Sequence, residues 1–134
     1  MKFVLDTNVF VSGVFFSGPP FQILKAWNDG KIQLVVSAEI LDEYRRVGEI
    51  LAEDHPNIDL KSVLDYVIRN AEVYTAPPLP ESVCDDPEDD KFLACALASG
   101  SVVIVSGDKH LHKVSGYKKV KVLKPRDFFN EFLV

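Results

Sequence analysis

Acidic side chains stand at several points of the chain where metal or acid–base chemistry would be expected. Asp6 ends the apolar run Phe3–Leu5 and is followed by two short polar side chains, Thr7 and Asn8. In an open α/β sheet, ligands bind beyond the carboxyl ends of the strands, so an acid placed there is a candidate site residue. Asp6 could equally cap the next helix or form an Asx turn, and alone it does not decide between the two interpretations.

Two further acids belong to the same edge of such a sheet. Glu43 lies in the early turns of a helix expected to begin after Ser37, at the border of its apolar stripe. Asp108 follows the run 102–105, which is predicted to be a buried strand. Because the carboxyl ends of parallel strands share one edge, and helices that leave a strand start there, topology alone brings Asp6, Glu43 and Asp108 to one rim.

The acid-rich stretch 86–90 opens another predicted helix, which ends at Gly100. At 100° per residue, Asp89 points the same way as the apolar face of this helix, whereas Asp90 lies on its flank and Asp86 is the expected N-cap. An inward acid is costly unless it is paired, hydrogen-bonded or bound to a cation. Asp89 could instead bond free backbone N–H groups of the first turn. The sequence does not force the preceding proline-rich connection to bring this helix to the rim.

Several carboxylates on one rim repel each other unless a positive charge lies among them. No His or Cys joins the acids, which disfavours zinc, and all-oxygen ligands suit Mg²⁺ or Mn²⁺. Such ions activate water and neutralise charge on a phosphate under in-line attack, so we expect phosphodiester hydrolysis. Among basic residues only Lys91 and Lys109 lie within these motifs. If a lysine or arginine filled the gap and neutralised any of the acids, the nuclease assignment would fail. Thr7, Asn8 and Ser106 could orient a carboxylate or a water, or could serve the turns.

Alternating strands and helices must position these acids. Apolar or β-branched runs predict strands at residues 3–5, 32–36, 72–75, 102–105 and 120–123, with helices in most of the intervals between them. This alternation predicts an α/β fold with a mostly parallel central sheet covered on both faces. The unbroken apolar run 102–105 suggests a central strand, and 120–123 an edge strand. The stretch 11–16 fits either a helix or a packed loop.

Composition limits the class of protein. A chain of 134 residues with 47% hydrophobic residues is expected to fold as one globular domain over residues 1–134. We expect no membrane span and no signal peptide, because no apolar run is long enough and Asp6 interrupts the first one. The two cysteines, Cys84 and Cys95, lack metal-site spacing and are interpreted as reduced thiols of a cytoplasmic protein.

The charge distribution leaves the question of a partner open. The net charge of −5 argues against nucleic acid, but the segment 109–126 holds seven Lys or Arg residues and no Asp or Glu. Such a segment is compatible with a phosphate backbone lying along one edge of the protein. It is also compatible with a solvated surface that has no partner, and charge alone favours that interpretation.

With these residues identified, the chain resembles the PIN-domain family of nucleases over nearly its whole length. The resemblance lies in four motifs: Val4–Val9 (VLDTNV), Ser37–Glu43 (SAEILDE), Asp86–Ala94 (DPEDDKFLA) and Ile104–Asp108 (IVSGD). Each motif is weak alone, whereas four in the right order form a strong signal. The chain is most similar to small bacterial and archaeal PIN proteins described as toxins of toxin–antitoxin pairs.

The resemblance implies a Mg²⁺- or Mn²⁺-dependent ribonuclease with a three-layer α/β/α fold and acidic positions at Asp6, Glu43, Asp89 and Asp108. Asp90 also lies near the third position, but the Asp-Pro-x-Asp pattern and the helix angle favour Asp89. In the leading hypothesis Asp6 and Asp89 hold the metal directly, while Glu43 and Asp108 complete its coordination or position water. The expected metal ligands are thus Asp6, Asp89 and Asp108. The resemblance also implies single-stranded RNA as substrate, a homodimer and, for a toxin, a small antitoxin protein.

Two other functions compete with this hypothesis. Receiver domains of signalling proteins also gather acids at the carboxyl edge of a parallel sheet, and they need a lysine after a late strand. Here Lys109 could take the role of that lysine. However, the acids here are spread over two helix starts, and receivers lack an inward glutamate like Glu43. The second alternative is a PIN-like fold without catalysis that binds RNA or acts as a scaffold. The pair His110 and His112 could chelate a metal, but in a basic loop it more often faces solvent or phosphate.

Overall fold

The computed structural model describes the whole chain, Met1–Val134, and confirms the alternation of strands and helices. The strands are β1 (Lys2–Leu5), β2 (Gln33–Val36), β3 (Glu72–Val73), β4 (Val103–Val105) and β5 (Lys121–Leu123). The longer helices are α1 (Thr7–Phe15), α2 (Pro19–Asn28), α3 (Ala38–Ala52), α4 (Leu60–Asn70), α5 (Asp90–Ser99) and α7 (Pro125–Phe132). A short helix α6 (Lys109–His112) and two 3₁₀ turns, η1 (Pro87–Asp89) and η2 (Tyr117–Lys119), complete the secondary structure.

All five strands are parallel and follow the order β3-β2-β1-β4-β5. The strand ends are level, because Leu5 is paired with Val105 and Val105 is paired with Leu123. The residues that directly follow the strands therefore form one edge, which we call the carboxyl rim. Its positions include Asp6 after β1, Ser37 after β2, Ser106 after β4 and Lys124 after β5.

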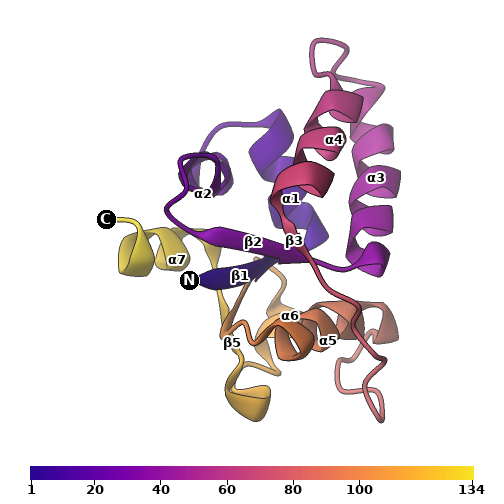
Figure 1. Ribbon diagram of the computed structural model, residues 1–134, viewed down its shortest axis with the longest axis vertical. Helices are drawn as coiled ribbons and strands as arrows, with labels where there is room; N and C mark the ends of the chain where they lie inside the picture. The colour runs from indigo at the N-terminus through magenta and orange to yellow at the C-terminus, as the bar shows by residue number, and fades with distance from the viewer.

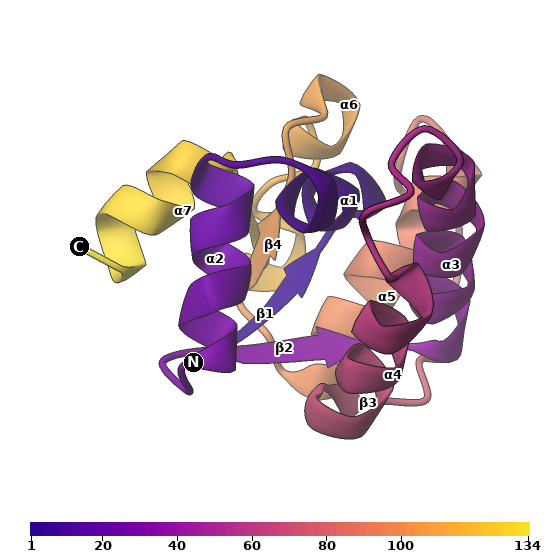
Figure 2. The same ribbon diagram turned by 90° about the horizontal axis from the view of Figure 1, so that it is seen from above.

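Helices cover both faces of the sheet and give the three-layer α/β/α arrangement. In Figure 1, α1 to α4 lie above the strands while α5 and α6 lie below them. Figure 2, seen from above, shows α2 on one side of β1 and β2 and shows α3 and α4 on the other. Helix α5 packs against β1, β2 and β4, and α7 packs beside α2. A single cluster of 29 buried residues forms the hydrophobic core. None of the helices has the length and apolar composition needed to cross a membrane.

Local sequence explains most element boundaries. Ser37 Oγ accepts a hydrogen bond from the Ile40 backbone N–H and caps α3, as predicted. The stretch 11–16, left open between helix and loop, is helical in α1, which Asp6 caps. The expected helix from Asp86 is split, because a 3₁₀ turn precedes α5. As predicted, β4 lies inside the sheet and β5 at its edge, although β4 begins one residue later than expected.

Candidate active site

Asp6 lies on the carboxyl rim and caps a helix at the same time. One carboxylate oxygen, Oδ1, accepts the backbone N–H of Val9 at 2.8 Å, and the other accepts the hydroxyl of Ser106. Only 5% of Asp6 is exposed. Burial raises the pKa of Asp6 above its ordinary value despite these hydrogen bonds, and the nearby charges of Asp108 and Glu43 raise it further. Asp6 can therefore be a helix cap and a candidate site residue at the same time.

The buried hydroxyl of Ser106 joins the acids that follow β1 and β4. Ser106 Oγ donates to Asp6 and accepts the backbone N–H of Asp108 at 2.9 Å. The Asp108 carboxylate in turn accepts the backbone N–H of His110 at 2.8 Å and caps α6. One oxygen of Asp108 thus remains without a hydrogen-bond partner. Of the small polar residues noted in the sequence, Ser106 and Thr7 donate to carboxylates, Ser106 to Asp6 and Thr7 to Glu43.

Asp89 is the acid that no other group satisfies. It occupies the N-cap position of α5, yet its side chain makes no capping hydrogen bond, so the alternative of a backbone-bonded first-turn acid does not apply. Burial raises its pKa to about 6, and the negative charges of Asp108 and Asp86 add to that shift. Smaller contributions come from Glu43 and Asp6. All four acids named from sequence are therefore within electrostatic reach of one another.

Asp90, the rival for the third acidic position, has a different task. Its carboxylate accepts the backbone N–H of Cys84 at 2.8 Å and that of Val83 at 3.3 Å. Although partial burial opposes the shift, these hydrogen bonds lower the pKa of Asp90. The contacts hold the connection between β3 and η1 against the start of α5, which brings Asp89 to the rim. Sequence analysis could not establish this step.

Glu43 has a basic partner that the sequence analysis did not predict. The Lys91 ammonium lies 2.6 Å from Glu43 Oε1, and the Thr7 hydroxyl donates to the other oxygen. Both side chains of the ion pair are largely buried, with 12% of Lys91 and 20% of Glu43 exposed. The sequence analysis took a lysine that neutralises any of the acids as a contradiction of the nuclease assignment. Lys91 pairs with Glu43 alone among the four, so a nuclease hypothesis has to rest on Asp6, Asp89 and Asp108.

Tyr44 is a positioning residue that sequence analysis missed. The spacing of the α3 stripe places it among apolar residues, and it is fully buried. Its hydroxyl, however, donates to the Leu5 backbone carbonyl at 2.7 Å, and its ring stacks on Phe10 with centroids 4.0 Å apart. Burial raises the pKa of Tyr44 well above its ordinary value. This contact fixes α3, and with it Glu43, against the end of β1 directly before Asp6.

These acids suit a divalent cation by the type of their donor atoms and not by their present arrangement. As the side chains stand, no group of three or more His, Cys, Asp or Glu residues is arranged to hold a metal ion. The donors are nevertheless hard carboxylate oxygens, and burial together with mutual repulsion raises the pKa of Asp6 and Asp89. A hard divalent cation is the partner that such a set suits.

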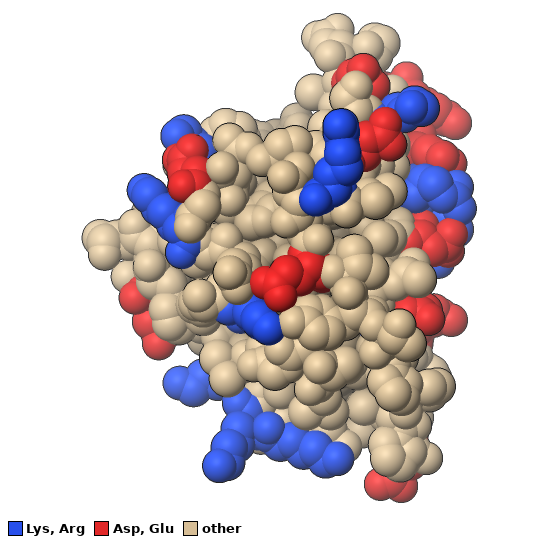
Figure 3. All heavy atoms as spheres, in the orientation of Figure 1, with Lys and Arg blue, Asp and Glu red and all other residues tan.

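The basic segment 109–126 does not form one surface. Lys109 lines a hollow of about 550 Å³ beside Asp108, together with Asn8 and Ser12. Lys124 also lies on the carboxyl rim, directly after β5. The residues of η2 and the start of β5 lie at the opposite end of that strand, and Figure 3 shows basic side chains gathered at this lower edge. Only part of the predicted phosphate-binding segment therefore lies beside the acids.

The two histidines of α6 are both engaged elsewhere. His110 Nδ1 lies 3.4 Å from Asp85, which also pairs with Lys113 at 3.2 Å. His112 Nε2 lies 2.6 Å from the Ser106 backbone carbonyl oxygen. They do not form a chelating pair.

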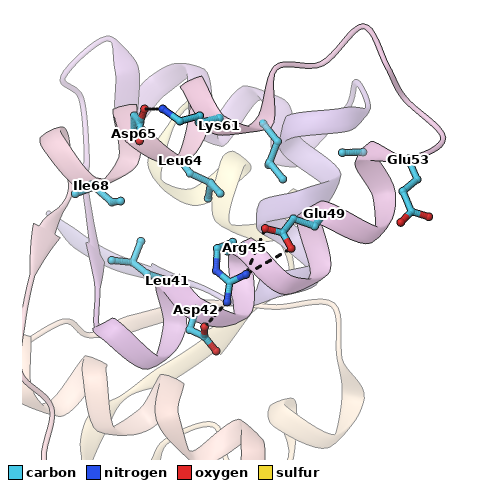
Figure 4. A pocket seen from close by; sticks show the side chains of 11 residues that line it. Leu41, Asp42, Arg45, Glu49, Glu53, Lys61, Leu64, Asp65 and Ile68 are labelled. Carbon is cyan, nitrogen blue, oxygen red and sulfur yellow. Dashed lines mark hydrogen bonds and ion pairs between the residues drawn. The ribbon is translucent and has the colours of Figure 1, made fainter.

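The largest groove of the molecule contains none of the candidate acids. It has a volume of about 780 Å³ and lies between α3 and α4, as Figure 4 shows. Most of its charged side chains pair with each other: Arg45 bridges Asp42 and Glu49, and Lys61 lies 3.2 Å from Asp65. This groove is therefore separate from the rim that carries the candidate acids.

Comparisons with known proteins agree with the geometry. A family model described as "PIN domain" matches residues 2–110, which span the four acidic positions. An uncharacterized protein of the archaeon Methanocaldococcus jannaschii is 29% identical, in an alignment that covers 98% of this chain and 92% of that protein.

Proposed function

Because the chain belongs to the PIN-domain family, whose members are generally nucleases, we propose that it is a Mg²⁺- or Mn²⁺-dependent endoribonuclease that hydrolyses RNA phosphodiester bonds. The observation that carries the proposal is the electrostatic conflict on the carboxyl rim. Asp6, Asp89 and Asp108 lie within reach of each other's charges, and none of them has a lysine or arginine partner. A divalent cation would relieve that conflict.

Each acid would contribute differently to the reaction. Asp6, Asp89 and Asp108 would hold the cation, and Ser106 would keep Asp6 in a fixed orientation through its hydrogen bond. The chemistry that a bound Mg²⁺ or Mn²⁺ supplies is activation of water and neutralisation of charge on the phosphate under attack. Glu43, held by Lys91 and Thr7, would shape the wall of the site.

The hollow beside Asp108 is the proposed contact for single-stranded RNA. Lys109 presents an ammonium group to it, and the side chains of Asn8 and Ser12 offer an amide and a hydroxyl. These donors suit the phosphate and sugar groups of a nucleic-acid backbone. Lys124, which follows β5 on the same rim, would extend that contact.

We further propose that residues 1–134 form one nuclease domain, since β5 and α7, beyond the family match, complete the sheet and its helical cover. The resemblance to small PIN toxins supports a role as the toxin of a toxin–antitoxin pair, with a homodimer and a small antitoxin protein as partner. Arrest of growth on expression, abolished by Asp89→Asn, is the expected outcome for a toxin. Unaltered growth with abundant wild-type protein would contradict that role.

Catalytically silent RNA binding is the main competing function. A silent protein would bind RNA without binding Mn²⁺ and without cutting. The receiver-like alternative is weaker, because Asp6, the acid after the central strand, is buried and both of its oxygens accept hydrogen bonds. A phosphoacceptor needs an accessible carboxylate oxygen.

Cleavage of a mixed single-stranded RNA pool, with mapping of the cut ends, tests the proposal. We expect purified protein to cut with Mn²⁺ and to stop when EDTA is added. Asp89→Asn should abolish cutting without unfolding the protein, because that side chain makes no hydrogen bond. Asp65→Asn, an exposed acid on α4, is the matched control and should cut normally. RNA left intact with Mn²⁺, or an Asp89→Asn variant as active as wild type, would refute the proposal.

A further inference from the structure

Lys91 is a basic side chain that pairs with Glu43, one of the four candidate acids. Its ammonium lies between two carboxylates, 2.6 Å from Glu43 and 3.2 Å from Glu88. The side chain leaves the first turn of α5, two residues after Asp89, and is 12% exposed. The interactions with Glu43 and Glu88 link α5 to α3 and η1. Lys91 is thus built into the wall of the site and is not a mobile surface lysine.

The partners of Lys91 suit an ammonium group. Glu43 and Glu88 place carboxylate oxygens 2.6 Å and 3.2 Å from its nitrogen. The ammonium also lies 5.9 Å from the centroid of the Phe92 ring, a distance at which a cation is attracted to an aromatic face. A lysine ammonium therefore stands at this end of the acid cluster.

Glu43 in turn has no oxygen left without a partner. One oxygen accepts from Lys91 and the other from the Thr7 hydroxyl. At the other end of the cluster, Asp89 has no partner. The acids therefore divide into a closed end around Glu43 and an open end around Asp89 and Asp108.

We propose that Lys91 is a positioning residue that holds Glu43 out of metal coordination and limits this site to one divalent cation. The inference rests on the proposed function and deepens it. A second divalent ion near Glu43 would have to approach an ammonium group at contact distance, which is strongly unfavourable in a partly buried site. One ammonium in place of a second metal also keeps Glu43 oriented when no metal is bound.

The surroundings of Lys91 make this proposal testable by substitution. A hollow of about 550 Å³ borders Lys91 and Glu88, so ions in solution have access to that side. Replacing Lys91 by glutamine would leave Glu43 and Glu88 facing each other without a positive charge. Two such carboxylates form a new attractive position for a divalent ion.

Isothermal titration calorimetry with Mn²⁺ alone measures the number of bound ions directly. We expect one Mn²⁺ per chain for wild type and two for Lys91→Gln. The double variant Glu43→Gln/Lys91→Gln should return to one, because the second position has lost its main ligand. Lys91→Arg should also bind one, since it restores the positive charge. Lys61→Gln, which removes an exposed lysine paired with Asp65, controls for the change in net charge and should bind one.

The outcomes separate this inference from the function on which it rests. Two Mn²⁺ ions bound by wild type, or a single ion bound by Lys91→Gln, would overturn the role of Lys91 and leave the nuclease proposal standing. Absence of any Mn²⁺ binding by wild type would overturn both. Cleavage of RNA is not needed as a readout.

A second variant keeps the test decisive where Lys91→Gln alone does not fold. The double variant exchanges the ion pair for two amides that can still hydrogen-bond, so it removes no hydrogen-bonding partner from the wall. If Lys91 holds Glu43 away from the metal, this variant should bind Mn²⁺ nearly as tightly as wild type. If Glu43 is a ligand or orients one, affinity should fall about 10- to 100-fold, and that result would overturn the proposal.

Discussion

Two acid-rich regions of this protein use the same residue types to opposite electrostatic effect. In the groove between α3 and α4, Asp42 accepts hydrogen bonds from Arg45 and Arg46 at 2.8 Å, and these bonds lower its pKa. Figure 4 shows such pairs along the groove, and all of them are exposed. On the carboxyl rim, burial and like charges raise the pKa of Asp6 and Asp89 instead.

The difference shows how a functional acid is distinguished from a structural one. In the groove Asp42, Glu49 and Asp65 pair with basic neighbours, and only the exposed Glu53 has no such partner. On the rim, burial and neighbouring negative charges disfavour the charged form of Asp6 and Asp89, which is expected where a site is organised for binding or catalysis. Cavity size alone favours the groove over the rim. Buried acids without a basic partner favour the rim.

The largest expected effect comes from removing the charge of Asp6. Asp6→Asn keeps a side-chain oxygen that can accept the Val9 backbone N–H, so α1 should remain capped. Loss of one metal-holding carboxylate should lower the rate of RNA cleavage about 1000-fold. Because the raised pKa means that the fold disfavours the Asp6 charge, the melting temperature of the metal-free protein should stay equal or rise.

Cleavage rates with saturating Mn²⁺, together with melting curves in EDTA, measure both effects. The combination of lost activity and retained or increased stability is what separates the rim from an ordinary buried ion pair. A variant that cuts RNA at the wild-type rate would exclude Asp6 from the site. A variant that is both inactive and strongly destabilised would assign Asp6 to the cap of α1 alone.

An intermediate effect is expected in the pH dependence of stability, through Asp89. Its pKa is about 6 in the folded protein, against an ordinary value of 3.8, so the folded state binds this proton more tightly than the unfolded chain does. The free energy of unfolding of the metal-free protein should therefore fall as pH rises from about 4 to about 6. Since Asp89 is half-exposed, we expect a loss of about 1 kcal/mol after allowing for solvent screening.

Urea denaturation at pH 4, 5, 6 and 7 in EDTA, compared between wild type and Asp89→Asn, isolates this contribution. The amide does not titrate, so the difference in stability between the two proteins should grow across this range in favour of the variant. Saturating Mn²⁺ should reverse the trend for wild type, because a cation competes with the proton for the carboxylate. If the free energy of unfolding changed equally with pH in the two proteins in EDTA, Asp89 would be well solvated and would not take part in the charge repulsion on the rim.

The sequence contained enough to predict the fold class and to bring Asp6 and Asp108 to one rim. The parallel direction of the strands follows from the alternation of elements, and both acids come directly after strands, so topology alone brings them together. Periodicity predicted that Asp89 faces inward while Asp90 lies at the flank. These properties are local, or follow from connection rules, and require no knowledge of side-chain contacts.

The partners of each acid could not be predicted in the same way. Lys91 is 48 residues away from Glu43 in the chain, and the direction of a flexible lysine is decided by the packing of α5 against α3. The hydroxyl of Tyr44 and its bond to the Leu5 carbonyl depend on the same packing. A charge count also left open whether the basic segment forms one surface, because it does not register the turn before β5 that carries part of the segment to the opposite end of the strand.

The smallest effect should come from Asp42→Asn in the groove, which is the direct counterpart of Asp6→Asn. Asp42 is an exposed acid on α3, one residue from Glu43, and its substitution removes the same charge as Asp6→Asn does. Arg45 would keep its contact with Glu49, and Arg46 would be solvated, so neither guanidinium becomes buried without a partner. Exposed ion pairs are weak and are screened by salt. Cleavage rate and Mn²⁺ stoichiometry should therefore match wild type, and melting temperatures should agree at high salt.

If Asp42→Asn slowed cleavage as much as Asp6→Asn does, acids with and without a basic partner would be functionally equivalent, and pairing would no longer distinguish the rim from the groove.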